Sequence, residues 1–81
     1  MSQTKVHEGV DVYAVFAGGK VLPRAFRWGG RTYTVDHVHQ HWAGRNGGVR
    51  LYYFAVTAAG NAYKLCFNAQ EMHWMLEEVY V

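Results

Sequence analysis

The amino-acid sequence predicts an all-β domain: a small curled antiparallel sheet or partly open barrel of five to six strands, with a long, bent third strand. Three observations predict it. Glycine-containing turns punctuate the 81 residues at regular intervals. The runs between those turns are rich in aromatic and β-branched residues, and most of them alternate apolar residues with others over lengths too short for helices.

The length of 81 residues predicts a single small β domain over residues 1–81. We expect residues 1–8 to form a flexible N-terminus. A domain this small buries only about 60% of its unfolded surface, so its core must be dense. The composition is 51% hydrophobic and 16% aromatic. Because each buried aromatic removes about 150–250 Å² from water, such a core can hold without a metal or disulfide.

The first two expected strands lie at residues 10–16 and 21–28. Apolar side chains alternate along the first, and Leu22, Phe26 and Trp28 share one face of the second. Pro23 cannot donate a ladder hydrogen bond, which indicates a sheet edge or a strand start. The glycine pair at 29–30 suits a two-residue hairpin turn into the next strand.

The third expected strand, residues 31–42, carries a conflict of parity. Tyr33 and Val35 are odd-numbered, whereas Val38 and Trp42 are even-numbered, so one regular strand cannot place all four on the core face. An extra residue near Asp36-His37 would bring them together, and we therefore expect a β-bulge there.

The fourth and fifth expected strands, residues 49–57 and 62–67, form a hairpin around the turn at residues 59–61. The tail, residues 69–80, fits two structures. Asn68 and Glu71 have the spacing of a helix-capping box. Alternatively, Trp74 and Leu76 alternate along a closing strand that covers a sheet edge, and we favour the strand. An SH3-like or OB-like barrel is the natural comparison for the whole.

The ordered motifs resemble a family of small, uncharacterised bacterial domains. The pattern F-x-W-x-G-R-x-Y-x-V spans residues 26–35, and W-x-L spans residues 74–76. The resemblance covers about residues 20 to 80. It implies an all-β fold with a terminal strand and carries no established activity, although some relatives look associated with DNA-repair polymerase genes. The histidines of the third strand lie outside the family pattern.

Those histidines, His37, His39 and His41, are weak candidates for a metal site. Alternate residues of a strand share a face, and imidazole is a common zinc ligand. The outer two would lie about 13 Å apart on a regular strand, too far to share one ion. We therefore expect no physiological metal and no cofactor; a pH response of the cluster is the other hypothesis.

Catalysis has little support in the sequence. The single cysteine, Cys66, needs a base and an electropositive setting to become a nucleophile, and His73 or the histidine run could only supply the base. No phosphate loop, metalloprotease motif or nucleophile elbow is present. We expect a protein that is not an enzyme.

Two binding classes remain. The first, which we favour, is a non-catalytic protein-interaction or accessory domain with a protein partner or a homodimer. The alternative is a single-stranded nucleic-acid-binding module, related to DNA repair through the resemblance, that uses one arginine and aromatic face. That alternative requires its candidate residues to share a face. The candidate residues for either ligand are Arg24, Arg27, Arg31, Arg45, Arg50, Tyr53, His39 and His41.

We expect a cytoplasmic location. The stretch MSQTKVHEGV lacks the apolar run of a signal peptide, and no run of 18 apolar residues indicates a membrane span. One cysteine cannot form an intramolecular disulfide. The net charge of +2 is only mildly basic, but the arginines cluster before residue 51.

Overall fold

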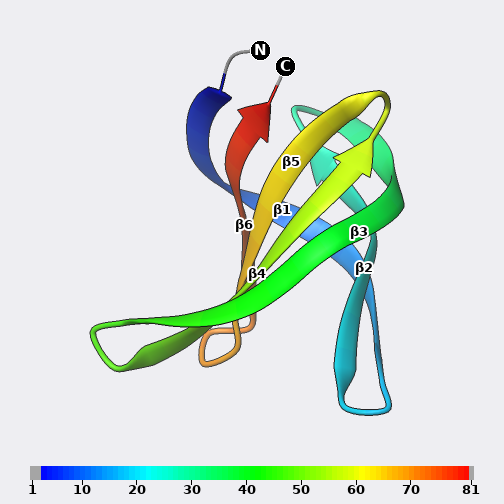
Figure 1. Ribbon diagram of the computed structural model, residues 1–81. Helices are drawn as coiled ribbons and strands as arrows, with labels where there is room; N and C mark the ends of the chain where they lie inside the picture. Colours follow the sequence, from blue (N-terminus) through cyan, green and yellow to red (C-terminus); the bar gives the residue numbers. More distant parts are fainter. Residues whose placement is uncertain (1–2, 81) are drawn as a thin grey trace.

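Six antiparallel strands form a closed ring in the computed structural model, which describes residues 3–80 (Figure 1). Each strand pairs with its neighbours in sequence, and β1 also pairs with β6. The all-β prediction is confirmed, with the sequential strand order of an up-and-down barrel. The strands are β1 (Gln3–Ala17), β2 (Lys20–Trp28), β3 (Arg31–Asn46), β4 (Val49–Ala58), β5 (Asn61–Asn68) and β6 (His73–Tyr80).

The turn between β2 and β3 is the two-residue hairpin that the sequence predicts. Trp28 pairs with Arg31, and Gly29 and Gly30 between them have φ angles of 61° and 77°. A type I′ turn needs positive φ at both central residues, where a side chain would be strained. The glycine pair therefore allows the tight turn that fixes the register of β2 against β3.

Strand β3 contains the expected bulge and a second one. The pairing shifts between Val35 and His37, which confirms the bulge at Asp36. It shifts again between Val38 and Gln40, leaving His39 as the extra residue. The second bulge exchanges the inner and outer faces for the residues that follow it. The pattern of apolar residues in the sequence did not require this second bulge.

The second bulge corrects the predicted orientation of two side chains. His41 lies opposite the buried Phe54 and so shares its inner face, whereas it was expected on the outer face. Trp42 lies opposite Tyr53 on the outer face, stacks on its ring at 5.5 Å, and is 41% exposed. Trp42 was expected in the core, and the expectation was wrong because it allowed for one bulge only.

Strands lie at both ends of the described residues 3–80, and residues 1 and 2 of the predicted flexible N-terminus lie outside this range. Residues 3–5, which were expected to be flexible, pair with residues 78–80 of β6. The tail is a strand, as favoured. Asn68 still makes the hydrogen bond of a helix cap, since its side-chain oxygen accepts from the backbone N–H of Glu71 at 3.1 Å, but the chain turns into β6 within the next few residues.

The core lies inside the ring, and most of its buried side chains come from β4, β5 and β6. Phe26, Leu65, Leu76 and Ala58 are fully buried, and no polar or charged side chain is buried among residues 3–80. Phe26 also packs face to face on Tyr33, with ring centroids 5.1 Å apart. Within the described residues no helix has the length and hydropathy needed to cross a membrane.

At one end of the barrel, two hairpins extend beyond the packed core (Figure 1). We name them the β1–β2 arm, residues 15–22, and the β3–β4 arm, residues 43–52. The opening between them is called the barrel mouth below. Because both arms belong to strands that continue into the core, the mouth has a rigid base.

Candidate ligand-binding site at the barrel mouth

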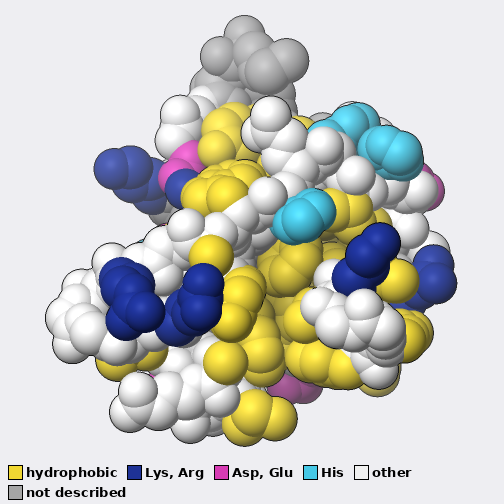
Figure 2. Space-filling model, turned by 60° about the horizontal axis from the view of Figure 1, so that its bottom comes forward, with side chains coloured by type: hydrophobic (Ala, Val, Ile, Leu, Met, Phe, Trp, Pro, Cys, Tyr) yellow, Lys and Arg dark blue, Asp and Glu magenta, His cyan; other side chains and the backbone are white. Residues whose placement is uncertain are grey.

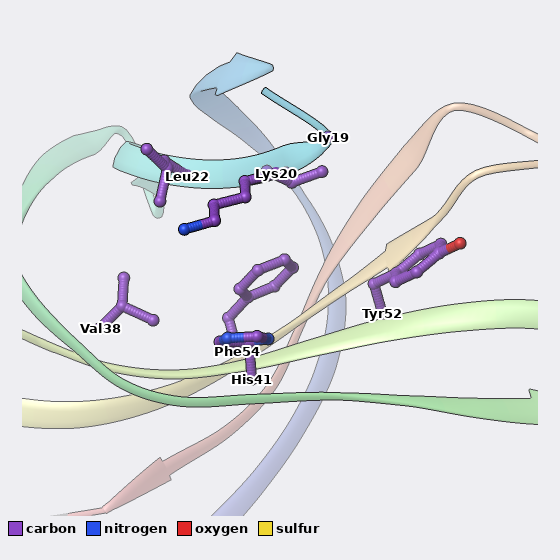
Figure 3. Close-up of a pocket in the computed structure, with 8 residues that line it drawn as sticks. Gly19, Lys20, Leu22, Val38, His41, Tyr52 and Phe54 are labelled. Atoms are coloured by element: carbon purple, nitrogen blue, oxygen red, sulfur yellow. The ribbon is translucent and has the colours of Figure 1, made fainter. Parts of the chain in front are cut away.

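A hollow of about 210 Å³ lies at the barrel mouth, between the two arms. Hydrophobic side chains line the recess between the arms (Figure 2). The close-up shows residues of β2 facing residues of β3 and β4 across it (Figure 3). The residues that line this mouth cavity are Gly19, Lys20, Val21, Leu22, Val38, His41, Tyr52 and Phe54.

Strand register explains why the wall of β3 and β4 faces the cavity. Val38 is opposite Val56, and after the second bulge His41 is opposite Phe54. Residues directly opposite in an antiparallel pair lie on one face. The His39 bulge therefore turns an imidazole inward beside Phe54, where an unbroken alternation would have kept it outside.

Positive charge flanks the mouth cavity from both arms. Lys20 follows the β1–β2 turn, pairs with Ala17, and extends from β2 over the space above Phe54 (Figure 3). On the β3–β4 arm Arg45 and Arg50 are directly opposite each other. The Arg50 guanidinium lies 5.7 Å from the ring centre of Tyr52, which lines the cavity. Lys and Arg side chains are visible on both sides of the recess (Figure 2).

Three carboxylates make side-chain contacts away from the mouth cavity, and Glu71 and Glu77 line a separate hollow beside Asn46 and Leu51 of the β3–β4 arm. Glu8 accepts a hydrogen bond from the Trp28 indole at 3.3 Å. Glu77 lies 3.3 Å from His7, and Glu78 lies 3.4 Å from Lys64. None of the six acidic residues lines the mouth cavity: Glu8, Asp11, Asp36, Glu71, Glu77 and Glu78. The lining of the cavity is therefore apolar and cationic.

The β1–β2 arm also presents an aromatic ring at the mouth. Phe16 is 57% exposed, and its ring packs edge-on against the buried Phe67 at 5.6 Å. The contact holds the ring in one place while leaving most of it in solvent. Exposed rings beside cations are the arrangement that stacks on planar ligands.

The structure brings together only part of the predicted site. His41, Arg45 and Arg50 lie at the mouth. Arg31 is at the opposite end, beside the β2–β3 turn, with its guanidinium 5.4 Å from the Tyr33 ring centre. Arg24 sits exposed where the β1–β2 register shifts.

The remaining candidates lie on the outer surface of the barrel. Arg27 is opposite Asp11. Tyr53 stacks on Trp42, and the Lys64 ammonium lies 5.2 Å from the Tyr53 ring centre. The eight candidates therefore do not share one face. Sequence reasoning missed Lys20, Phe16, Tyr52 and Phe54 at the mouth, although the placement of two turns at one barrel end could have indicated Lys20.

The three histidines do not converge. His37 and His39 have ring centres 4.6 Å apart on the outer face, where the His39 Nε2 is 3.2 Å from the Thr57 hydroxyl. His41 turns to the inner face. Residues 3–80 contain no group of three or more His, Cys, Asp or Glu placed to hold a metal ion.

Cys66 is buried and lines an outer-face hollow with Tyr53, His73 and Glu77. Burial, followed by the negative charge of Glu77, raises the pKa of its thiol to about 11. The thiol is therefore protonated at neutral pH, the opposite of what a nucleophilic cysteine requires.

Comparison with known proteins finds one family. A family described as a domain of unknown function, DUF6504, matches residues 1–80. No curated protein matches the sequence, and no solved structure does.

Proposed function

The chain belongs to the DUF6504 family of domains of unknown function, and we propose that it binds single-stranded nucleic acid at the barrel mouth. One observation carries the proposal: Lys20 lines an apolar hollow that no carboxylate lines, and Arg50, opposite Arg45, lies against its lining residue Tyr52 from the other arm. The arginine and aromatic face on which the nucleic-acid alternative rested is not formed, because its eight candidate residues do not share one face. The present proposal rests on a different set of residues, those at the barrel mouth.

The chemistry of the mouth matches the two parts of a single strand. Lys20, Arg45 and Arg50 supply permanent charge for phosphates, whose binding releases counterions. Phe16 and Tyr52 supply rings on which bases can stack, a contact that contributes about 1–3 kcal/mol per base. A single strand exposes its bases to such a hollow, whereas a duplex keeps them stacked and paired inside the helix.

The role we propose is non-catalytic. The protonated, buried Cys66 is a poor nucleophile, and the mouth carries no carboxylate that could act as a general base beside His41. The mouth therefore offers binding groups without a complete acid–base pair.

A protein-interaction role is the second candidate, and a separate observation favours it. Tyr13 and Val15 of β1 are 57% and 41% exposed, and they lie beyond the mouth cavity. Exposed apolar side chains that follow one another on one strand are typical of a contact with a protein partner or a second copy. Sedimentation velocity measures this directly: a dimer that Tyr13→Ser dissociates supports it, and a monomer at all concentrations contradicts self-association.

The nucleic-acid proposal is tested by fluorescence anisotropy with an oligothymidylate of about ten nucleotides. If three phosphates are neutralised, log K should fall with log salt with a slope of about −2 between about 50 and 200 mM. Lys20→Glu should weaken binding at least about tenfold and flatten the slope.

The matched control is Arg31→Glu, which changes the charge equally at the opposite end of the barrel. It should weaken binding far less than Lys20→Glu. Absence of binding at low salt would contradict the proposal. Equal losses in the two variants would show that net charge, and not the mouth, is responsible.

A further inference from the structure

The mouth cavity is too small for a large ligand and large enough for one ring. Its volume of about 210 Å³ is below the range of about 300–1,000 Å³ that is usual for drug-sized ligands. The floor is fixed, because Phe54 is only 5% exposed and packs on Trp74 with ring centres 5.5 Å apart. One flat group can therefore enter without displacing the core.

The cavity combines apolar side chains with two nitrogen-bearing ones. Leu22, Val38 and Phe54 form an apolar surface, and Lys20 and His41 reach it from opposite walls (Figure 3). An ammonium group only donates hydrogen bonds, whereas an imidazole can donate or accept. A flat ring with carbonyl oxygens at its edge suits this arrangement.

The phosphate-binding groups are continuous with this cavity. Tyr52 lines the cavity, and the Arg50 guanidinium lies over its ring. Arg45, opposite Arg50, extends the positive charge toward the tip of the arm. Arg50 and Tyr52 are alternate residues of β4 and so share a face, and a strand held by the two arginines would meet the cavity beyond Tyr52.

We infer that the mouth cavity receives one unstacked pyrimidine base of the bound strand, a thymine or uracil, whose carbonyl oxygen accepts a hydrogen bond from Lys20. The inference rests on the proposed function and deepens it by naming the part of the ligand that enters. A pyrimidine is the smaller class of base. Thymine and uracil carry two carbonyl oxygens and no amino group that would face the ammonium of Lys20.

The test separates base binding from phosphate binding. Two strands of equal length are compared: one entirely abasic, and one abasic except for a single central thymine. They carry the same phosphates. We expect the single thymine to raise affinity about tenfold, since stacking of one base is within that range.

A variant that fills the cavity gives the second readout. Leu22→Trp places a large ring in the cavity and should abolish the thymine advantage while leaving the affinity for the abasic strand unchanged. Thr32→Trp is the control, because Thr32 is exposed beside the β2–β3 turn at the opposite end of the barrel, where a tryptophan cannot reach the cavity, and the advantage should persist. Retained binding of the abasic strand also shows that the variant is folded.

The possible outcomes are distinct. Equal affinity for the two strands, with Lys20→Glu still weakening both, would overturn the base cavity and leave the proposed function intact. Failure of both strands to bind would overturn the two together. Binding of an acidic, leucine-containing peptide at the mouth in place of either strand would assign the cavity to a protein side chain instead and overturn both.

Discussion

Two regions of the ring differ in how well they bury their inward-facing side chains. One is the wall, formed by β4, β5 and β6, and the other is the mouth, formed by the two arms. In the wall, inward residues such as Val56, Leu65 and Leu76 are at most 1% exposed. At the mouth, the inward-facing Phe16 is 57% exposed. Inward-facing side chains are therefore buried in the wall, whereas at the mouth an inward-facing ring stays exposed.

Charge follows the same division. On the outer wall, Lys64 pairs with Glu78 and His7 with Glu77. On the β3–β4 arm, Arg45 faces Arg50, another cation. Opposed like charges destabilise a strand pair, so the arrangement costs stability and is suited to an anionic ligand. The wall maintains the fold, and we propose that the mouth binds.

The largest loss of stability is expected from a substitution in the wall. Leu65→Ala removes a fully buried side chain and should lower the free energy of unfolding by about 2–5 kcal/mol, because it leaves a cavity as well as losing buried area. Urea denaturation followed by tryptophan fluorescence measures it. Leu22→Ala, the same change at the half-exposed mouth, is the control and should cost much less; equal losses would contradict the division.

The next effect separates binding from stability. Arg50→Glu should lower the affinity for oligothymidylate at least about tenfold, since it replaces an attraction to phosphate with a repulsion. The same change places a carboxylate opposite Arg45, so thermal stability without ligand should stay level or rise. Anisotropy and a melting curve on one preparation check both. A fall in both affinity and thermal stability would show that Arg50 stabilises the fold, and would contradict this prediction.

A smaller effect tests the second bulge. Trp42→Ala should cost about 1 kcal/mol, the worth of a partly exposed ring stacked on Tyr53 with Lys64 beside it. A tryptophan buried in the core would cost about 3–5 kcal/mol. Urea denaturation distinguishes the two values, and the larger one would return Trp42 to the core.

The position of Trp42 could not be predicted from the sequence. The parity of Tyr33 and Val35 against Val38 required one bulge, and the structure has it. That pattern did not indicate the bulge at His39, because tryptophan and histidine side chains such as Trp42 and His41 are found on both the inner and the outer face of a sheet. Local alternation therefore predicted the strands and turns, whereas the residues beyond His39 depended on pairing with β4.

The candidate site was less predictable for a related reason. Arg45 and Arg50 were selected by charge, but charge alone could not separate them from Arg31 at the other end of the barrel. The distinction depends on which turns meet at one end, a property of the closed ring. Lys20 was missed because a lysine after a glycine turn reads as an ordinary solvated residue.

The smallest effect concerns pH and the outer wall. A hydrogen bond from the Tyr80 hydroxyl, followed by contacts with Lys64, lowers the pKa of Glu78 below its usual value. A carboxyl with a lowered pKa contributes stability above its unfolded pKa of about 4.3, and the contribution is lost as pH falls through the folded value. Glu78→Gln should therefore flatten the acid side of the stability profile. A profile parallel to that of the unsubstituted protein would exclude this contribution.

The central claim is that the mouth, and not the outer wall, meets the ligand. Amide chemical shifts followed by NMR during titration with oligothymidylate test it most directly. We predict that the largest shifts will fall in residues 18–22 and 44–50, the ends of the two arms, while residues 62–66 and 75–78 of the wall change little. Shifts concentrated in the wall around Lys64, with the arms unchanged, would contradict the account.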